Sequence, residues 1–340
     1  MSPIPRPLPL LGLAAASVLV LAGCASGGTA GEQDAGLTVV ASTDVYGQIA
    51  EEIGGDLIEV TSIITNASQD PHSFEPSAQD QLAISRADLI IENGGGYDAF
   101  IDALIESSGS EAAVVTAVEH SHDWPENDGH DEEGSTEDGA TEEGAAEEDH
   151  DHEHGDEHDH EHEHVEGFNE HVWYDPHTVE HVAEAIAEEL SELDPDNAET
   201  YAAGAEAFAV EIEGLEASLA DLDATYGGAK VFAAEPVPGY LFAAAGLEDV
   251  TPAAFSEAVE EGQDVPPATL LESLELIDSG DVVLVATNTQ TAGAETAQVV
   301  ADAEANGIPT VAFAETLPEG QTYISWMQAN IEALEDALAA

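Results

Sequence analysis

The stretch from Asp194 to Tyr226, DPDNAETYAAGAEAFAVEIEGLEASLADLDATY, predicts one long helix around which the rest of the chain is organised. Its apolar residues recur at intervals of three and four, with one gap of seven, so they form a single stripe. They are Tyr201, Phe208, Ile212, Leu215, Leu219 and Leu222. At 1.5 Å per residue this helix is roughly 45 Å long, which is the width of a domain. We therefore predict a rigid linker helix over 194–226 that joins two lobes.

On the N-terminal side of this helix, short apolar strands alternate with helical patterns. Strands are predicted at 37–42, 57–64, 87–92 and 112–116, and helices at 45–53, 78–85, 97–107 and 177–190. Ser77 stands where its hydroxyl can cap the second helix. Strands that alternate with helices are typical of parallel βαβ units. The sequence thus predicts an N-terminal α/β lobe over 37–193.

The same alternation resumes after Gly227 and Gly228, which end the linker helix. Strands are predicted at 231–234, 282–286 and 309–313, and helices at 240–245, 267–279 and 294–306. A final helix carries Ile324, Met327, Ile331, Leu334 and Leu338 on one face. The fold class is therefore α/β, with a second βα lobe over 227–340.

The charge balance is extreme and excludes several partners. Three Lys and Arg residues stand against 73 Asp and Glu residues, a formal net charge of −70. Such a field repels nucleic acid and anionic membrane surfaces, which are themselves polyanions. Self-repulsion also destabilises the compact state, so we expect salt or divalent cations to stabilise it. Adaptation to a saline habitat would explain the same composition.

The N-terminus has the pattern of a secretory signal. Arg6 precedes an apolar run from Leu8 to Leu21, which is shorter than the roughly 20 residues that a membrane span requires. Cys24, the single cysteine, resembles the lipid-modified cysteine of bacterial lipoproteins. We predict a signal peptide over 1–23, acylation of Cys24 and a flexible tether over 24–36. The mature protein would then be extracytoplasmic, and its lipid would anchor it to the outer face of the cell membrane.

Residues 119–170 form an acidic, histidine-rich stretch with almost no apolar residues. It cannot build a core, so we predict a disordered loop. Imidazoles that alternate with carboxylates are typical of metal binding, here at low affinity. The histidines are His150, His152, His154, His158, His160, His162 and His164. The alternative is a solvated spacer that binds no metal.

Four further side chains are candidate metal ligands. His72, Glu235 and Glu315 each follow a predicted strand, and His171 ends the acidic stretch. Ligands of open α/β sheets bind beyond the carboxyl ends of the strands, so these residues could meet in a cleft between the lobes. Two imidazoles and two carboxylates would make a closed four-residue metal site. Taken singly, each is equally compatible with a turn, a helix cap or the surface.

Two motifs carry a family resemblance: Asp70-Pro71-His72-Ser73-Phe74-Glu75-Pro76 and His171-Val172-Trp173-Tyr174-Asp175-Pro176. With the acidic loop between them, the chain resembles the metal-binding lipoproteins of bacterial zinc and manganese ABC importers, the ZnuA/TroA-like family. The resemblance implies two α/β lobes bridged by a rigid helix. It implies His72 and His171 as metal ligands and Glu235, five residues before Tyr240, as the third. The fourth would be Glu315, where the family more often has Asp.

The resemblance implies a monomeric solute-binding protein, not an enzyme. It would capture Zn²⁺ as its transported ligand and deliver it to an ABC permease, whose ATPase subunit hydrolyses ATP. The chain itself has no phosphate-binding Gly-rich loop that ends in Lys-Ser or Lys-Thr. Two carboxylates suit Mn²⁺ about as well, whereas a high density of imidazoles favours Zn²⁺. Protons should compete with the metal for both imidazoles, so binding should weaken in acid.

Two other functions remain open at this point. A secreted zinc hydrolase would need an open coordination position and a general base, and the His-Glu-x-x-His motif is absent. A surface zinc buffer or cell-adhesion protein would use the loop as its working part. Binding of one tight ion favours the importer component, and binding of many weak ions favours the buffer.

Overall fold

The computed structural model describes residues 36–127, 165, 167–291 and 293–340. The predicted signal peptide, Cys24 and the histidines from His150 to His164 lie outside the described residues. In the described part of the chain, no helix combines the length and the apolar character that crossing a membrane requires.

The first lobe is a parallel sheet with helices on both faces. Its strands are β1 (Leu37–Thr43), β2 (Ile58–Ile64), β3 (Leu89–Glu92) and β4 (Ala113–Thr116), in the order β2-β1-β3-β4. Its helices are α1 (Asp44–Gly54), α2 (Ala78–Ile84), α3 (Phe100–Ser108) and α4 (Pro176–Leu193). Short 3-10 turns are η1 (Gly55–Leu57), η2 (Pro71–Ser73), η3 (Ala117–His120), η4 (Pro125–Asn127) and η5 (Val172–Tyr174). The parallel sheet agrees with the prediction.

Side chains alternate between the two faces of this sheet, as the period of a strand requires. Val39 and Ala41 of β1 pack with α1 and α4, while Val40 packs with α2 and α3 on the opposite face. The capping of α2 follows the sequence, because the Ser77 hydroxyl accepts from the backbone N–H groups of Gln79 and Asp80.

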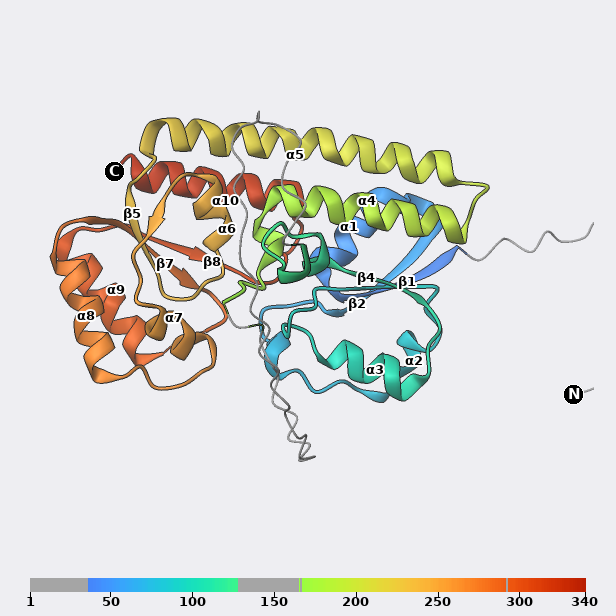
Figure 1. Ribbon diagram of the computed structural model, residues 1–340, viewed down its shortest axis with the longest axis horizontal. Helices are drawn as coiled ribbons and strands as arrows, with labels where there is room; N and C mark the ends of the chain where they lie inside the picture. Colours follow the sequence, from blue (N-terminus) through green and yellow to red (C-terminus); the bar gives the residue numbers. More distant parts are fainter. Residues whose placement is uncertain (1–35, 128–164, 166, 292) are drawn as a thin grey trace, which may run out of the picture. The chain divides into compact units, whose positions relative to one another are not determined.

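The second lobe repeats the arrangement. Its strands are β5 (Lys230–Ala233), β6 (Glu248–Asp249), β7 (Val282–Asn288) and β8 (Thr310–Phe313), all parallel in the order β6-β5-β7-β8. Its helices are α6 (Gly239–Ala244), α7 (Ala253–Glu260), α8 (Pro267–Asp278), α9 (Ala294–Asn306) and α10 (Tyr323–Leu338). The first and last of these helices pack on one face, and the other three pack on the opposite face (Figure 1).

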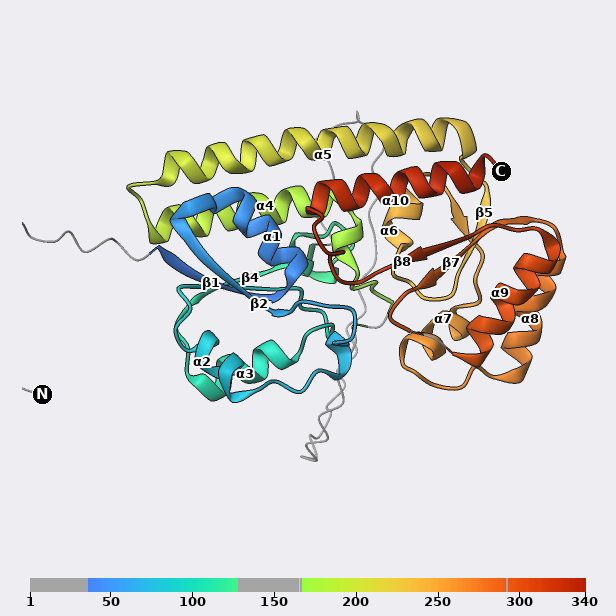
Figure 2. The same cartoon turned by 180° about the vertical axis from the view of Figure 1, so that it is seen from behind.

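Helix α5 (Ala198–Tyr226) joins the lobes. It packs on α1 and α4 of the first lobe and on α6 and α10 of the second, as both views show (Figures 1 and 2). Its predicted stripe is buried, and Ala205 fills the gap between Tyr201 and Phe208. A Cβ on Gly204 would lie 2.5 Å from the backbone oxygen of Ile53, so only glycine permits this approach of α1 to α5.

The structure differs from the prediction in three places. Helix α5 begins at Ala198 rather than Asp194, because the Asp194 carboxylate accepts from the side chains of Asn197 and Tyr201 in a turn. Strand β6 and helix α7 were not predicted. Strand β6 has two residues and α7 buries only two side chains, so neither has enough apolar residues to show the periodicity of a strand or a helix. The ends of the acidic stretch are ordered, with Trp124 packed edge-on against Phe168 at 5.1 Å between ring centroids.

Candidate metal centre

His72 is held by a tight turn at the end of the loop that follows β2. The Asp70 carboxylate accepts from the backbone N–H of His72 at 3.0 Å and from the Ser73 hydroxyl at 2.8 Å. Nδ1 of His72 lies 3.3 Å from Oε1 of Glu170, which is buried. A carboxylate beside Nδ1 favours a proton on that nitrogen, which makes Nε2 the metal-binding nitrogen of the ring.

His171 is buried, with 1% of its surface exposed, and its ring is oriented by Asn169. The side-chain amide of Asn169 donates to the backbone oxygen of Pro236 at 3.0 Å, so its Oδ1 faces His171. That oxygen accepts from the backbone N–H of His171 at 3.1 Å and lies 2.8 Å from Nδ1. Nδ1 therefore carries the proton, and Nε2 is the metal-binding nitrogen.

The loop before α6 supports this orientation from the second lobe. The Tyr240 hydroxyl donates to the backbone oxygen of Asn169 at 2.9 Å. A Cβ on Gly239 would lie 2.7 Å from Nδ2 of Asn169, so a larger residue here would displace the amide that orients His171. The segment that follows Glu235 thus fixes a residue that orients His171.

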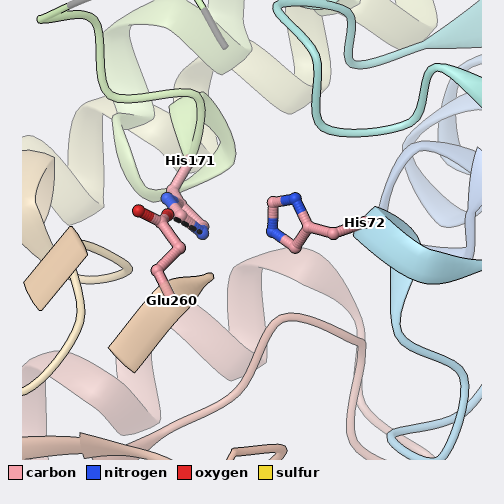
Figure 3. A group of neighbouring side chains, drawn as sticks. All are labelled: His72, His171 and Glu260. Atoms are coloured by element: carbon pink, nitrogen blue, oxygen red, sulfur yellow. Dashed lines mark ion pairs between the residues drawn. The ribbon is translucent and has the colours of Figure 1, made fainter. Parts of the chain in front are cut away.

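Glu260, the last residue of α7, reaches the two imidazoles from the second lobe. Its Oε1 lies 3.8 Å from Nε2 of His171, and the His72 ring faces this pair from the first lobe (Figure 3). One potential ligand atom from each of His72, His171 and Glu260 lies within 4.8 Å of the others. Ligands that hold Zn²⁺ tetrahedrally are about 3.4 Å apart, so the distances between these ligand atoms need to shorten by at most about 1.4 Å.

Glu235 and Glu315 line the same cavity as His72 and Glu260, and the two acids share one amide. Nδ2 of Asn288 donates to Oε2 of Glu235 at 2.9 Å and to Oε1 of Glu315 at 2.5 Å. The Thr291 hydroxyl donates to the other oxygen of Glu235, and the Tyr97 hydroxyl donates to Oε2 of Glu315 at 3.1 Å. Both carboxylates are buried and held in fixed positions by neutral donors.

These donors leave both acids without a compensating positive charge. Burial raises the pKa of the Glu235 carboxyl, and burial raises the pKa of Glu315 to about 7, with Glu235 and Asp70 adding to the effect. A carboxyl whose pKa is raised by burial keeps its proton to a higher pH unless another cation replaces the proton. A divalent metal ion is such a cation.

Four carboxylates and one imidazole surround a cavity of about 160 Å³ between the lobes. The acids are Asp70, Glu235, Glu260 and Glu315, and the imidazole is that of His72. Among the described residues no Lys or Arg lines it. Because the walls are acidic and hold imidazole, the cavity suits a divalent metal ion and disfavours an anion.

The structure brings the four predicted residues to one place. His72 and His171 have ring centroids 6.4 Å apart, and His72, Glu235 and Glu315 line the same cavity. Sequence reasoning missed Glu260, whose carboxylate lies 3.8 Å from Nε2 of His171. Its only sequence signal is a pair of acids, Glu260 and Glu261, before Gly262, in a chain where acids are everywhere.

Two parallel α/β lobes joined by a long helix, with donors from both lobes around one cavity, define the class of two-lobed substrate-binding proteins. A family model described as "Zinc-uptake complex component A periplasmic" matches residues 39–337. The chain therefore belongs to this family, ZnuA, whose members are substrate-binding proteins of ABC importers and not enzymes.

Individual relatives agree with this membership. The manganese-binding lipoprotein MntA of Halalkalibacterium halodurans is 30% identical over 199 residues, which cover 58% of this chain and only 54% of that protein. The manganese ABC transporter substrate-binding lipoprotein PsaA of Streptococcus pneumoniae serotype 4 is 26% identical, with 95% of this chain and 96% of that protein covered. The solved periplasmic zinc-binding protein TroA of Treponema pallidum has the same fold, with a TM-score of 0.67 at 17% identity over 90% of this chain and 100% of that one.

Proposed function

We propose that this protein captures a divalent transition-metal ion, Zn²⁺, in the cavity between its lobes and delivers it to an ABC permease with an ATPase subunit. The observation that carries the proposal is the set of four carboxylates around the cavity, with Glu235 and Glu315 buried and no Lys or Arg among the lining residues. Only Arg86 and Lys230 supply such cations within residues 36–340, and Lys230 lies 3.5 Å from Asp281, outside the cavity.

His72, His171, Glu235 and Glu315 are the proposed ligands, with Glu260 as an additional oxygen donor. The two imidazoles each have Nδ1 beside an oxygen acceptor, and such second-layer contacts raise affinity for a metal. Glu235 and Glu315 would exchange part of their hydrogen bonding for the ion. Donors from both lobes mean that the ion itself ties the lobes together.

Zinc is proposed over manganese because His72 lines the cavity with the His171 ring close by, at 6.4 Å between ring centroids, and because further imidazoles occur in the acidic stretch. Manganese is the second candidate, favoured by the number of carboxylates around the cavity and by the names of the relatives MntA and PsaA. Loading the full-length protein with both ions at once, followed by elemental analysis, separates them. If the protein bound more Mn²⁺ than Zn²⁺ at equal free concentrations of the two ions, manganese rather than zinc would be the proposed ligand.

The acidic stretch is proposed as a low-affinity collector of zinc at His150, His152, His154, His158, His160, His162 and His164. Deleting His120 to His164 should leave one tightly bound ion per chain. If the deletion also abolished binding of that ion, the acidic stretch would itself be the tight site, and the proposal of a low-affinity stretch beside a tight cavity site would be wrong.

We further propose that the mature protein begins at an acylated Cys24, is tethered by 24–36 and acts as a monomer outside the cell membrane. The relatives named as lipoproteins support this location. Mass spectrometry of the membrane fraction tests it, because diacylation adds a defined mass to Cys24. A Cys24→Ser protein that stayed in the membrane fraction would contradict the anchor.

The decisive experiment is a zinc titration of purified full-length protein with single replacements of His72, His171, Glu235 and Glu315. We expect one tight ion in the parent protein and loss of tight capture in the His72→Ala and His171→Ala variants. Unchanged tight capture in all four variants would overturn the cleft as the metal site.

A further inference from the structure

We propose that the outer surface of α4 and α5 carries a second divalent metal site, formed by His177, Glu180 and Glu216. None of these three residues lines the cleft cavity. The inference therefore does not depend on what the cleft binds.

The hairpin of α4 and α5 brings the three donors together. Helix α4 ends at Leu193 and α5 begins at Ala198, and the two helices pack side by side (Figure 1). His177 lies in the first turn of α4, and Glu216 lies at a similar distance from the connecting turn along α5. The fold thus places residues far apart in the chain opposite each other.

The distances suit a shared cation. Nδ1 of His177 lies 3.7 Å from Oε1 of Glu216. Glu180 follows His177 by three positions and so shares its helix face. One ligand atom from each of the three lies within 4.8 Å of the other two. A cation between them would need only a small inward movement of exposed side chains.

Imidazoles distinguish this place from an ordinary acidic surface. His181 stacks edge-on against His177, with ring centroids 4.8 Å apart, and its Nδ1 lies 3.1 Å from Oε2 of Glu184. His120 of η3 interacts electrostatically with His181 and Glu184, and burial lowers its pKa, which favours the neutral form of the imidazole. Neutral imidazoles are ligands of borderline metal ions, whereas carboxylates alone select no such ion.

The carboxylates of this cluster repel one another. Burial raises the pKa of the Glu180 carboxyl, and Glu216 and Glu184 raise it further. The only Arg and Lys among the described residues, Arg86 and Lys230, lie at the end of α2 and beside Asp281. A divalent cation bound here relieves this repulsion.

One nitrogen and two oxygens from protein, with water completing the shell, suit Zn²⁺ and ions of similar size. His177 and Glu216 are 57% and 41% exposed, so solvent screens the site and its affinity should be lower than that of the cleft. An ion bound here would cross-link α4 to α5 and slow local opening of the hairpin.

Crystals of the full-length protein grown with Zn²⁺ test the site by anomalous diffraction at the zinc edge. We expect a peak bonded to His177 and Glu216, and we expect its occupancy to fall at least tenfold in Glu216→Gln. Hydrogen exchange in solution should slow with added Zn²⁺ at 176–184 and 212–220 in the parent protein, and not in Glu216→Gln.

Glu188→Gln is the matched control, since it removes one exposed charge from α4 away from the cluster. It should leave the peak and the slowed exchange unchanged. Absence of the peak at saturating Zn²⁺ in the parent protein, or equal slowing in Glu216→Gln, overturns the second site. A peak in the cleft reports on His72 and His171 independently, so the two proposals fail separately.

Discussion

The cleft and the outer face of the α4–α5 hairpin contain the same two kinds of ligand in very different surroundings. In the cleft, His171, Glu235 and Glu315 are at most 4% exposed and are positioned by hydrogen bonds. On the hairpin, His177 is 57% exposed and its contacts are loose. Burial makes uncompensated acids costly and fixed positions spare the ion an ordering cost, so the cleft should bind far more tightly.

The comparison is tested most strongly by removing one imidazole from each region. His171→Ala should lower the affinity for Zn²⁺ at the cleft by about a thousandfold, because it removes a pre-oriented ligand. His181→Ala, on the hairpin, should leave that affinity within about twofold. Competition with a chromophoric chelator measures both, and equal losses would remove the distinction between the regions.

Glu315→Gln should stabilise the metal-free protein while it weakens metal capture. The Glu315 carboxyl has a pKa of about 7 in the folded protein and about 4.5 when unfolded, so only the unfolded chain releases its proton between these pH values. The free energy of unfolding therefore falls as pH rises through this window. Glutamine does not titrate. Relative to the parent protein, the Glu315→Gln variant should therefore have a free energy of unfolding that is about 3 kcal/mol higher at pH 8 and little changed at pH 4.5.

Urea unfolding of the metal-free variants at pH 5 and pH 8 measures this difference. The Tyr97 hydroxyl can accept from the new amide, so the replacement preserves the local packing. Glu216→Gln on the hairpin is the control and should change stability by less than about 0.5 kcal/mol, as exposed charges do. A Glu315→Gln protein that lost stability at pH 8 would contradict the absence of a compensating charge in the cleft.

Asn288→Leu separates positioning from ligation. Leucine removes the amide shared by Glu235 and Glu315, so the affinity for Zn²⁺ should fall roughly tenfold to a hundredfold without loss of a proposed ligand. Asn306→Leu, at an exposed amide far from the cleft, serves as the control. Calorimetric titration gives both values, and equal affinities in the two variants would mean that the carboxylates do not need to be held in place.

Glu260→Gln should have the smallest effect and should depend on the ion. It removes a charged oxygen donor and leaves both imidazoles, so Mn²⁺ should lose about tenfold in affinity and Zn²⁺ less. Separate titrations of the parent protein and the variant with the two ions give the ratio of the affinity for Zn²⁺ to the affinity for Mn²⁺ in each protein. An unchanged ratio would assign Glu260 to the wall of the cavity rather than to the ion.

The sequence by itself determined the α/β alternation and the buried stripe of α5, and its two motifs pointed to His72 and His171, whose ring centroids lie 6.4 Å apart. Those features are local: a period of two or of three to four residues, or a proline-bounded motif such as that around His72, carries its own signal. The start of α5 was misplaced by four residues because side-chain hydrogen bonds of Asp194 prolong the turn.

Only the tertiary structure decided which acids meet the imidazoles. Among 73 acidic residues the sequence pointed to Glu235 and Glu315 but not to Glu260, which ends a helix too short to predict. The pairing of His177 with Glu216 likewise arises from the packing of two helices. Proximity between residues distant in the chain depends on how the lobes and helices pack, and local sequence patterns do not encode that distance.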